Sequence, residues 1–101
     1  MPKKPYTIEE IKRIAVPIAK QYGVKKLALF GSYARGEQSA ESDIDFLIDK
    51  GRIRGLQFFG FANALEDKFG KSVDLLSYGA IHWFIVDDVM RDEVVLYEQA
   101  G

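Results

Sequence analysis

Apolar residues recur along the chain at two spacings, one typical of helices and one typical of strands. Residues 8–22, 56–69 and 81–91 place apolar side chains every three or four positions, which predicts three amphipathic helices. Between them lie short runs of apolar and β-branched residues, which are typical of buried strands. The predicted strands are residues 26–30, 43–49 and 72–77, with a short last strand at 94–97.

Residues at the ends of these segments support the boundaries. Thr7 and Glu10 have the spacing of a capping box, so the first helix should begin at residue 8. Pro17 lies inside this helix and lacks the N–H that continues the hydrogen-bond ladder, so we expect a kink there. Gly23 is a typical helix stop. The polar segment Ser32–Ser42 predicts a loop that holds about one helical turn.

The order of the elements predicts a mixed α+β fold, in which helices pack on a small mixed β-sheet of three to four strands. A helix connects the second and third predicted strands, and such a crossover favours parallel pairing. Asp43 and Asp45 are two residues apart and should share one face of their strand, while Ile44 points into the core. We expect one domain over residues 1–101, with a flexible N-terminus at 1–6.

Composition and charge narrow the class of protein. The 101 residues include 14 Lys and Arg against 15 Asp and Glu, a net charge of −1, so we do not expect direct nucleic-acid binding. The absence of Cys excludes a disulfide scaffold and thiolate metal sites, and it fits a reducing cytoplasm. Apolar runs are too short to span a bilayer, and none follows the basic start of the chain. We therefore expect neither membrane association nor a signal peptide.

Three carboxylates are predicted to meet at one edge of the sheet. Asp43 and Asp45 open the second strand, and Asp74 opens the third strand beside it. The first strand ends at Gly31-Ser32, and a short antiparallel connection would bring this turn to the same edge. Close carboxylates repel one another unless they bind protons or a cation. A set of oxygen ligands without Cys or a nearby His suits Mg²⁺, with Mn²⁺ as a substitute. Two such ions can support phosphoryl or nucleotidyl transfer.

Other segments have simpler interpretations. Gly70-Lys71-Ser72 has the form of a P-loop ending, but the Gly required five positions earlier is Leu65, and the order helix–turn–strand is wrong. His82 has no second His at ligand spacing and is interpreted as a surface residue. The predicted helix at 81–91 has a second apolar row that the sheet would not cover. Either this row is exposed, which favours contact with a partner and leaves self-association open, or the helix is buried more completely than the pattern indicates.

The spacing of the candidate site residues resembles a family signature. An Asp-x-Asp pair alone is most often a solvated strand face. Here Phe30-Gly31-Ser32, then ten residues, then Asp43-Ile44-Asp45-Phe46 is similar to the motif of the DNA polymerase β-like nucleotidyltransferases. Asp74 matches the third acidic residue of that motif, which stands on a later strand. Over residues 8–98 the chain resembles the minimal nucleotidyltransferases (MNT), which are the antitoxins of HEPN–MNT toxin–antitoxin pairs.

The resemblance implies a polymerase β-like nucleotidyltransferase fold and a nucleotide-binding turn. Gly31 and Ser32 would hold the β- and γ-phosphates of ATP, because Gly lets the backbone approach phosphate and Ser offers a hydroxyl and an N–H. Arg35 would contact the triphosphate, or its side chain would pair with Glu37 instead.

The resemblance also implies a reaction. Asp43 and Asp45 would ligate Mg²⁺, and Asp74 would complete the catalytic metal site and help deprotonate the acceptor hydroxyl. Proteins of this kind resemble enzymes that transfer AMP from ATP to a Tyr of the HEPN toxin and so silence its RNase activity.

Two alternatives stay open at this point. The chain could be a non-catalytic binding module that neutralises its toxin by occlusion. It could also be a nucleotidyltransferase that modifies a small molecule, although 101 residues leave little chain for a dedicated acceptor pocket.

Overall fold

The computed structural model describes residues 5–39, 41–49, 51, 53–77 and 93–99. In chain order the elements are α1 (Ile8–Tyr22), β1 (Lys26–Phe30), α2 (Gly31–Arg35), β2 (Ile44–Asp49), α3 (Leu56–Phe69), β3 (Val73–Ser77) and β4 (Val94–Glu98). Each predicted helix and strand among these residues is confirmed to within one residue at either end. The helix predicted at 81–91, and His82 within it, lie outside the described residues.

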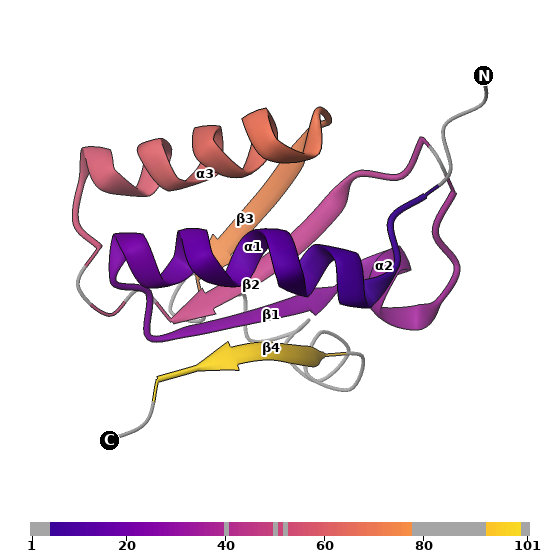
Figure 1. Ribbon diagram of the computed structural model, residues 1–101, viewed down its shortest axis with the longest axis horizontal. Coiled ribbons are helices and arrows are strands. Elements are labelled where there is room, and N and C mark those ends of the chain that lie inside the picture. Colours follow the sequence, from indigo (N-terminus) through magenta and orange to yellow (C-terminus); the bar gives the residue numbers. More distant parts are fainter. Residues whose placement is uncertain (1–4, 40, 50, 52, 78–92, 100–101) are drawn as a thin grey trace.

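The four strands form one mixed sheet in the order β3-β2-β1-β4 (Figure 1). Strands β2 and β3 are parallel, as the helical crossover between them predicts. Strand β1 runs antiparallel to both β2 and β4. The predicted α+β class is therefore confirmed, and all four strands that the pattern indicates belong to the same sheet.

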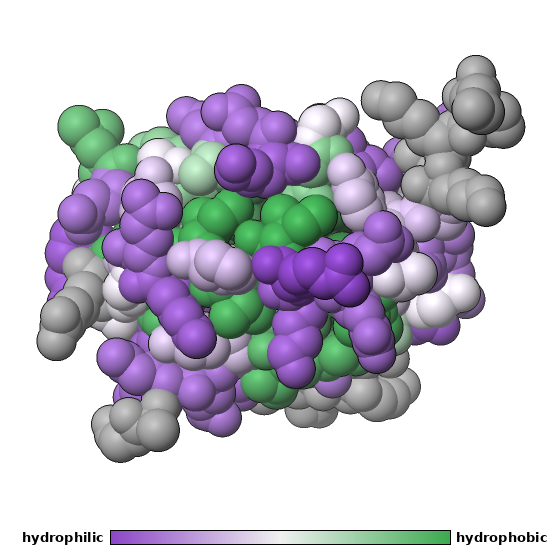
Figure 2. Space-filling model, viewed as in Figure 1, coloured by the Kyte–Doolittle hydropathy of each residue, from purple (hydrophilic) through white to green (hydrophobic). Residues whose placement is uncertain are grey.

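Helices α1 and α3 lie side by side on one face of this sheet (Figure 1). The alternating apolar residues of β2 point toward them, and Ile44, Phe46 and Ile48 are fully buried. From α3, Phe61 and Leu65 complete this core. Hydrophilic side chains cover much of the outer surface of the helices, with apolar surface between them (Figure 2). The core thus fixes the faces of β2 and leaves its first residues at an edge of the sheet.

The beginning of α1 has the predicted capping box. The Glu10 N–H donates to Thr7 Oγ1 at 3.1 Å, and the Thr7 N–H donates to Glu10 Oε1 at 3.0 Å. The backbone hydrogen bond from Thr7 also holds the pKa of Glu10 below its ordinary value. The helix continues through Pro17, whose side chain is exposed, and a kink at this residue stays a prediction.

The N-terminal segment that was expected to be flexible is anchored at its end. Tyr6 Oη donates to the carbonyl oxygen of Phe69 at 2.6 Å, and the two rings meet edge to face at 5.1 Å between centroids. Phe69 is the last residue of α3. Tyr6 therefore belongs to the folded part of the molecule, and the aromatic contact is the physical reason. None of the helices described here is long and apolar enough to cross a membrane.

Candidate active site

The two parallel strands place their acidic residues side by side. Asp45 is the register partner of Asp74, and Ile44 is the partner of Val73. The pairing extends one residue before β3, because the N–H of Ile44, the first residue of β2, donates to the carbonyl oxygen of Ser72 at 3.3 Å. Adjacent strands lie about 4.8 Å apart, so two carboxylates in register stand within reach of one hydrogen bond or one shared cation.

The end of β1 brings the Gly-Ser turn to the same place. Phe30 pairs with Asp45 in the antiparallel ladder, and Gly31 follows with a φ of +72°. A methyl group at Gly31 would overlap the Asp45 carboxylate oxygen Oδ2. Position 31 therefore requires glycine for two reasons, its left-handed backbone and the carboxylate against it. The predicted convergence of this turn with Asp45 and Asp74 is present in the structure.

The pKa of Asp45 is determined by its burial and by the charged groups around it. This pKa is raised from 3.8 to about 6, and burial is the largest cause. A side-chain hydrogen bond with Asp74 and the negative charges of Asp74 and Asp43 contribute to the same rise, whereas the positive charge of Arg35 opposes it. Asp43 is exposed and directly precedes β2, and Asp74 is exposed on β3. The site thus holds three acidic groups, of which Asp45 and Asp74 are in direct contact.

The donor set fits a hard divalent cation with few protein ligands. Within the described residues, no three His, Cys, Asp or Glu side chains are arranged to hold one metal ion, so the expected cup of three carboxylates is not formed as a complete set of ligands. The contact between Asp45 and Asp74 provides a pair, with Asp43 close enough to act through its charge. Mg²⁺ typically takes one or two carboxylates and fills its other positions with water and substrate phosphates. The carboxylates of Asp45 and Asp74 supply oxygen ligands in that number.

The residues around the turn lie as follows. Ser32 is the second residue of α2 and is partly exposed. Arg35 ends the same helix, and its Nε donates to Glu37 Oε1, which is the second of its two predicted arrangements. Its charge still reaches Asp45. A contact of Arg35 or Ser32 with phosphate stays a prediction.

One contact beside the turn was not predicted from the sequence. Lys71 Nζ donates to Tyr33 Oη at 3.1 Å, and it thereby connects the residues before β3 with α2. The sequence does indicate that Tyr33 is buried, because it is the one aromatic residue of the polar segment Ser32–Ser42. Polar segments seldom retain a large ring unless the ring is buried.

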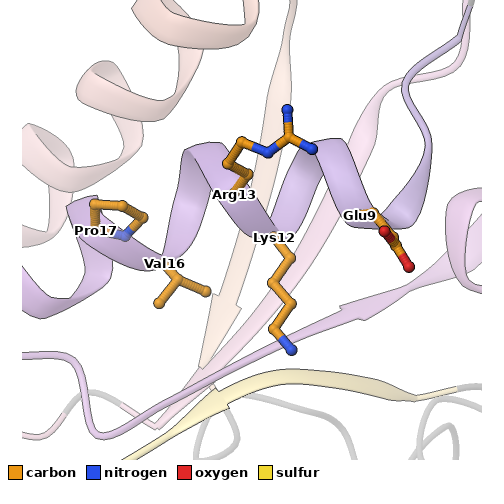
Figure 3. Close-up of a pocket in the computed structure, with 5 residues that line it drawn as sticks. All are labelled: Glu9, Lys12, Arg13, Val16 and Pro17. Carbon is orange, nitrogen blue, oxygen red and sulfur yellow. The ribbon is translucent and has the colours of Figure 1, made fainter.

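Two hollows lie elsewhere on the described surface. One, of about 530 Å³, is lined by α1 residues that include Glu9, Lys12 and Arg13, whose side chains project from the helix beside Val16 and Pro17 (Figure 3). The other, of about 490 Å³, lies at the start of α3. No predicted site residue lines either hollow among the described residues. The candidate active site is the edge where Gly31, Asp45 and Asp74 lie together.

This fold, with a Gly-Ser turn against paired acidic residues, defines a nucleotidyltransferase. Residues 9–100 match the family model described as polymerase beta, nucleotidyltransferase, and the chain belongs to this family.

The relatives match most of this chain. A Methanocaldococcus jannaschii protein that is provisionally named a protein adenylyltransferase is 42% identical over 88 residues, which are 86% of this chain and 95% of that protein. The protein adenylyltransferase MntA of Thermococcus cleftensis is 36% identical over 93 residues, which are 87% of this chain and 94% of that protein.

Solved structures share the fold. A crystal structure of a toxin–antitoxin with AMP-PNP has a TM-score of 0.74 at 20% identity, over 87% of this chain and 73% of that chain. A tri-AMPylated Shewanella oneidensis HEPN toxin in complex with its MNT antitoxin gives a TM-score of 0.69 at 16% identity, over 90% of this chain and 72% of that chain. These likenesses establish the minimal nucleotidyltransferase fold for this chain.

Proposed function

We propose that this nucleotidyltransferase is an antitoxin that transfers AMP from ATP to a hydroxyl group of a cognate HEPN toxin, with a Tyr as the acceptor. The observation that carries the proposal is the register pair of Asp45 and Asp74, with Gly31 directly against Asp45. The relatives named protein adenylyltransferase, and the toxin–antitoxin complexes of the same fold, support protein as the acceptor.

The chemistry is a displacement at the α-phosphorus of ATP. The acceptor oxygen forms a new bond to this phosphorus, and the bond from the phosphorus to the bridging oxygen of the β-phosphate breaks. Pyrophosphate leaves, and the proton of the hydroxyl is taken up by the Asp74 carboxylate and passes to solvent. The products are the AMP ester of the toxin, pyrophosphate and a proton, so atoms and charges balance.

The residues of the turn and of the two strands have different roles in this AMP transfer. Gly31 and Ser32 bind the β- and γ-phosphates and hold the α-phosphorus in front of the acceptor, and Arg35 contributes positive charge beside the triphosphate. Asp43 and Asp45, with Asp74, would hold two Mg²⁺ ions. These ions would neutralise the phosphates and the leaving pyrophosphate. The protein positions the reacting groups, which is the main contribution that phosphoryl-transfer enzymes make.

The test is intact-mass spectrometry of a co-expressed candidate HEPN partner, after incubation with ATP and Mg²⁺. We expect the mass of the partner to increase by whole AMP units with the wild-type protein. The variant Asp43→Asn/Asp45→Asn should reduce the transfer rate by at least about a hundredfold, because it removes two of the three carboxylates that would hold the two metal ions. Chelation with EDTA should abolish transfer by the wild type.

The outcomes separate the alternatives. Full transfer by the double variant would end the catalytic assignment. Neutralisation of the toxin by that variant without any mass change would support occlusion instead. Release of pyrophosphate from ATP with a small-molecule acceptor, but with no modification of the partner, would support a small-molecule nucleotidyltransferase.

A further inference from the structure

Helix α2 carries the phosphate-binding turn of the proposed function and depends on tertiary contacts for its position. It has five residues, Gly31–Arg35, and helices this short are unstable without tertiary contacts. Its one buried side chain is Tyr33, which is 0% exposed and belongs to the hydrophobic core. The orientation of Gly31 and Ser32 therefore depends on how Tyr33 is held.

The hydroxyl of Tyr33 is held by Lys71. The Lys71 ammonium group donates to Tyr33 Oη at 3.1 Å and lies 5.4 Å from the centroid of the ring. A buried phenol requires a partner for its hydroxyl, and a hydrogen bond from a charged donor is stronger than one from a neutral donor. The contact also joins segments that are 38 residues apart in the chain.

Lys71 belongs to a segment that is held by hydrogen bonds and lies close in sequence to Asp74. It follows Gly70, the C-cap of α3, and precedes Asp74 by three positions. The start of β3 is fixed from two sides, because the Val73 N–H donates to Glu66 Oε2 at 3.1 Å and the Ser72 carbonyl accepts from Ile44. A displacement of α2 relative to Asp74 would break the contact between Lys71 and Tyr33.

From this geometry we propose that Lys71 and Tyr33 are positioning residues of the nucleotidyl-transfer site, which set the Gly31-Ser32 turn at a fixed distance from Asp74. The inference rests on the proposed function, since it assigns the turn to phosphate binding. Neither side chain touches the reacting atoms. Tyr33 acts through α2, and Lys71 acts through Tyr33.

The test measures binding of Mg²⁺–AMP-PNP by isothermal titration calorimetry. Tyr33→Phe removes only the hydroxyl and keeps the buried ring, and Lys71→Met removes the donor. Each should weaken binding about tenfold or more, because a misplaced turn loses contacts with the phosphates. The variant Tyr33→Phe/Lys71→Met should bind no more weakly than the single variants, since both remove the same contact. Lys71→Arg, which keeps a cationic donor, should retain binding to within about threefold.

The chain offers a matched control in the pair Lys20 and Tyr97. Lys20 Nζ lies 5.6 Å from the centroid of the Tyr97 ring, and Tyr97 pairs with Leu27, at the other end of β1 from Gly31. Lys20→Met and Tyr97→Phe should leave the affinity for Mg²⁺–AMP-PNP unchanged. If they weaken binding as much as the variants at Lys71 and Tyr33, or if the latter bind normally, the proposal is wrong.

Amide hydrogen exchange tests the positioning role independently of the proposed function. In the nucleotide-free protein, Tyr33→Phe and Lys71→Met should speed exchange of the amides in residues 31–36, and the control variants should not. A wild-type protein that binds no nucleotide, or binds it without transferring AMP, would contradict the proposed function only. Unchanged exchange in residues 31–36 of both variants would contradict the positioning role itself.

Discussion

At the scale of single residues, the ionised carboxylate of Asp45 lowers the stability of the folded protein. Its carboxylate is partly buried, contacts Asp74 and is close to the charge of Asp43, so its ionised form is disfavoured in the folded protein. The unfolded chain imposes no such penalty. The charge of Asp45 therefore does not help the protein to fold, which agrees with the chemical role that we propose for it.

The first prediction at this scale is that Asp45→Asn stabilises the metal-free protein. An amide can donate to Asp74 where two carboxylates repel each other, and it carries no charge to bury. We expect a gain of about 1 kcal/mol at pH 7 after allowing for solvent screening, which corresponds to roughly 4–8 °C in the melting temperature of a domain of this size. Thermal unfolding in EDTA followed by circular dichroism measures it.

The pH dependence of that gain follows from the pKa of Asp45. Below pH 4 the group is protonated in both states, so wild type and variant should be equally stable. Between pH 4 and about 6 the unfolded chain loses the proton while the folded protein retains it, so the wild type loses stability relative to Asp45→Asn. Above pH 6 the difference should be constant. Asp67→Asn, at an exposed position of α3, is the control, and a difference that does not change with pH would contradict the assignment.

A second prediction at the residue scale concerns two glycines with the same backbone conformation. Gly31 has a φ of +72° and Gly36 of +74°, so alanine should cost about 1 kcal/mol of stability at either position. Only at Gly31 would the methyl group meet Asp45; at Gly36 no atom lies within 4 Å. Gly31→Ala should therefore lower AMP transfer at least about tenfold more than Gly36→Ala in the intact-mass assay. Equal transfer by the two variants would show that the turn can move away from Asp45 without loss.

At the scale of elements, the sequence predicts most of what the structure contains. The capping box at Thr7, the apolar periodicity of α1 and α3, and the parallel crossover are local or topological rules, and each is confirmed. In α3 the apolar stripe predicted by the spacing consists of Phe58, Phe61, Ala62, Leu65 and Phe69, of which Phe61, Leu65 and Phe69 are buried. Leu56 and Phe59 are outside this stripe and are 85% and 64% exposed. Hydrophobic spacing thus separates core from surface on one helix.

The arrangement around α2 shows where such rules fail. The segment Ser32–Ser42 is too polar to show a period, so the sequence predicts a turn but not which residue anchors it. The anchor, Tyr33, acquires its partner from a residue far along the chain, and no spacing rule relates positions 33 and 71. The contact of Asp45 with Asp74 is predictable, because strand register fixes it. The position of the Asp43 side chain is not, because it depends on side-chain conformations at the edge of the sheet.

At the scale of the whole molecule, the candidate active site lies at one edge of the sheet, and helices α1 and α3 cover one face of the sheet (Figure 1). Strand β2 is central to this arrangement, since β1 brings Gly31 to one side of Asp45 and β3 brings Asp74 to the other. Because three segments must fold together to make the edge, a ligand that binds there stabilises the entire domain and not one element.

The final prediction is therefore a ligand-linked rise in global stability. Mg²⁺ with AMP-PNP should raise the melting temperature of the wild type, because it neutralises the carboxylates and fills the turn. At a ligand concentration of about 100 times the Kd, the expected gain is about 2.7 kcal/mol. Asp43→Asn/Asp45→Asn should start from a higher melting temperature in EDTA and gain little from the ligand, so the order of stability of the two proteins should reverse on saturation. NaCl at equal ionic strength controls for screening of charge. Equal gains in both proteins would mean that the ligand binds away from this edge, and the paired carboxylates would then have no part in holding it.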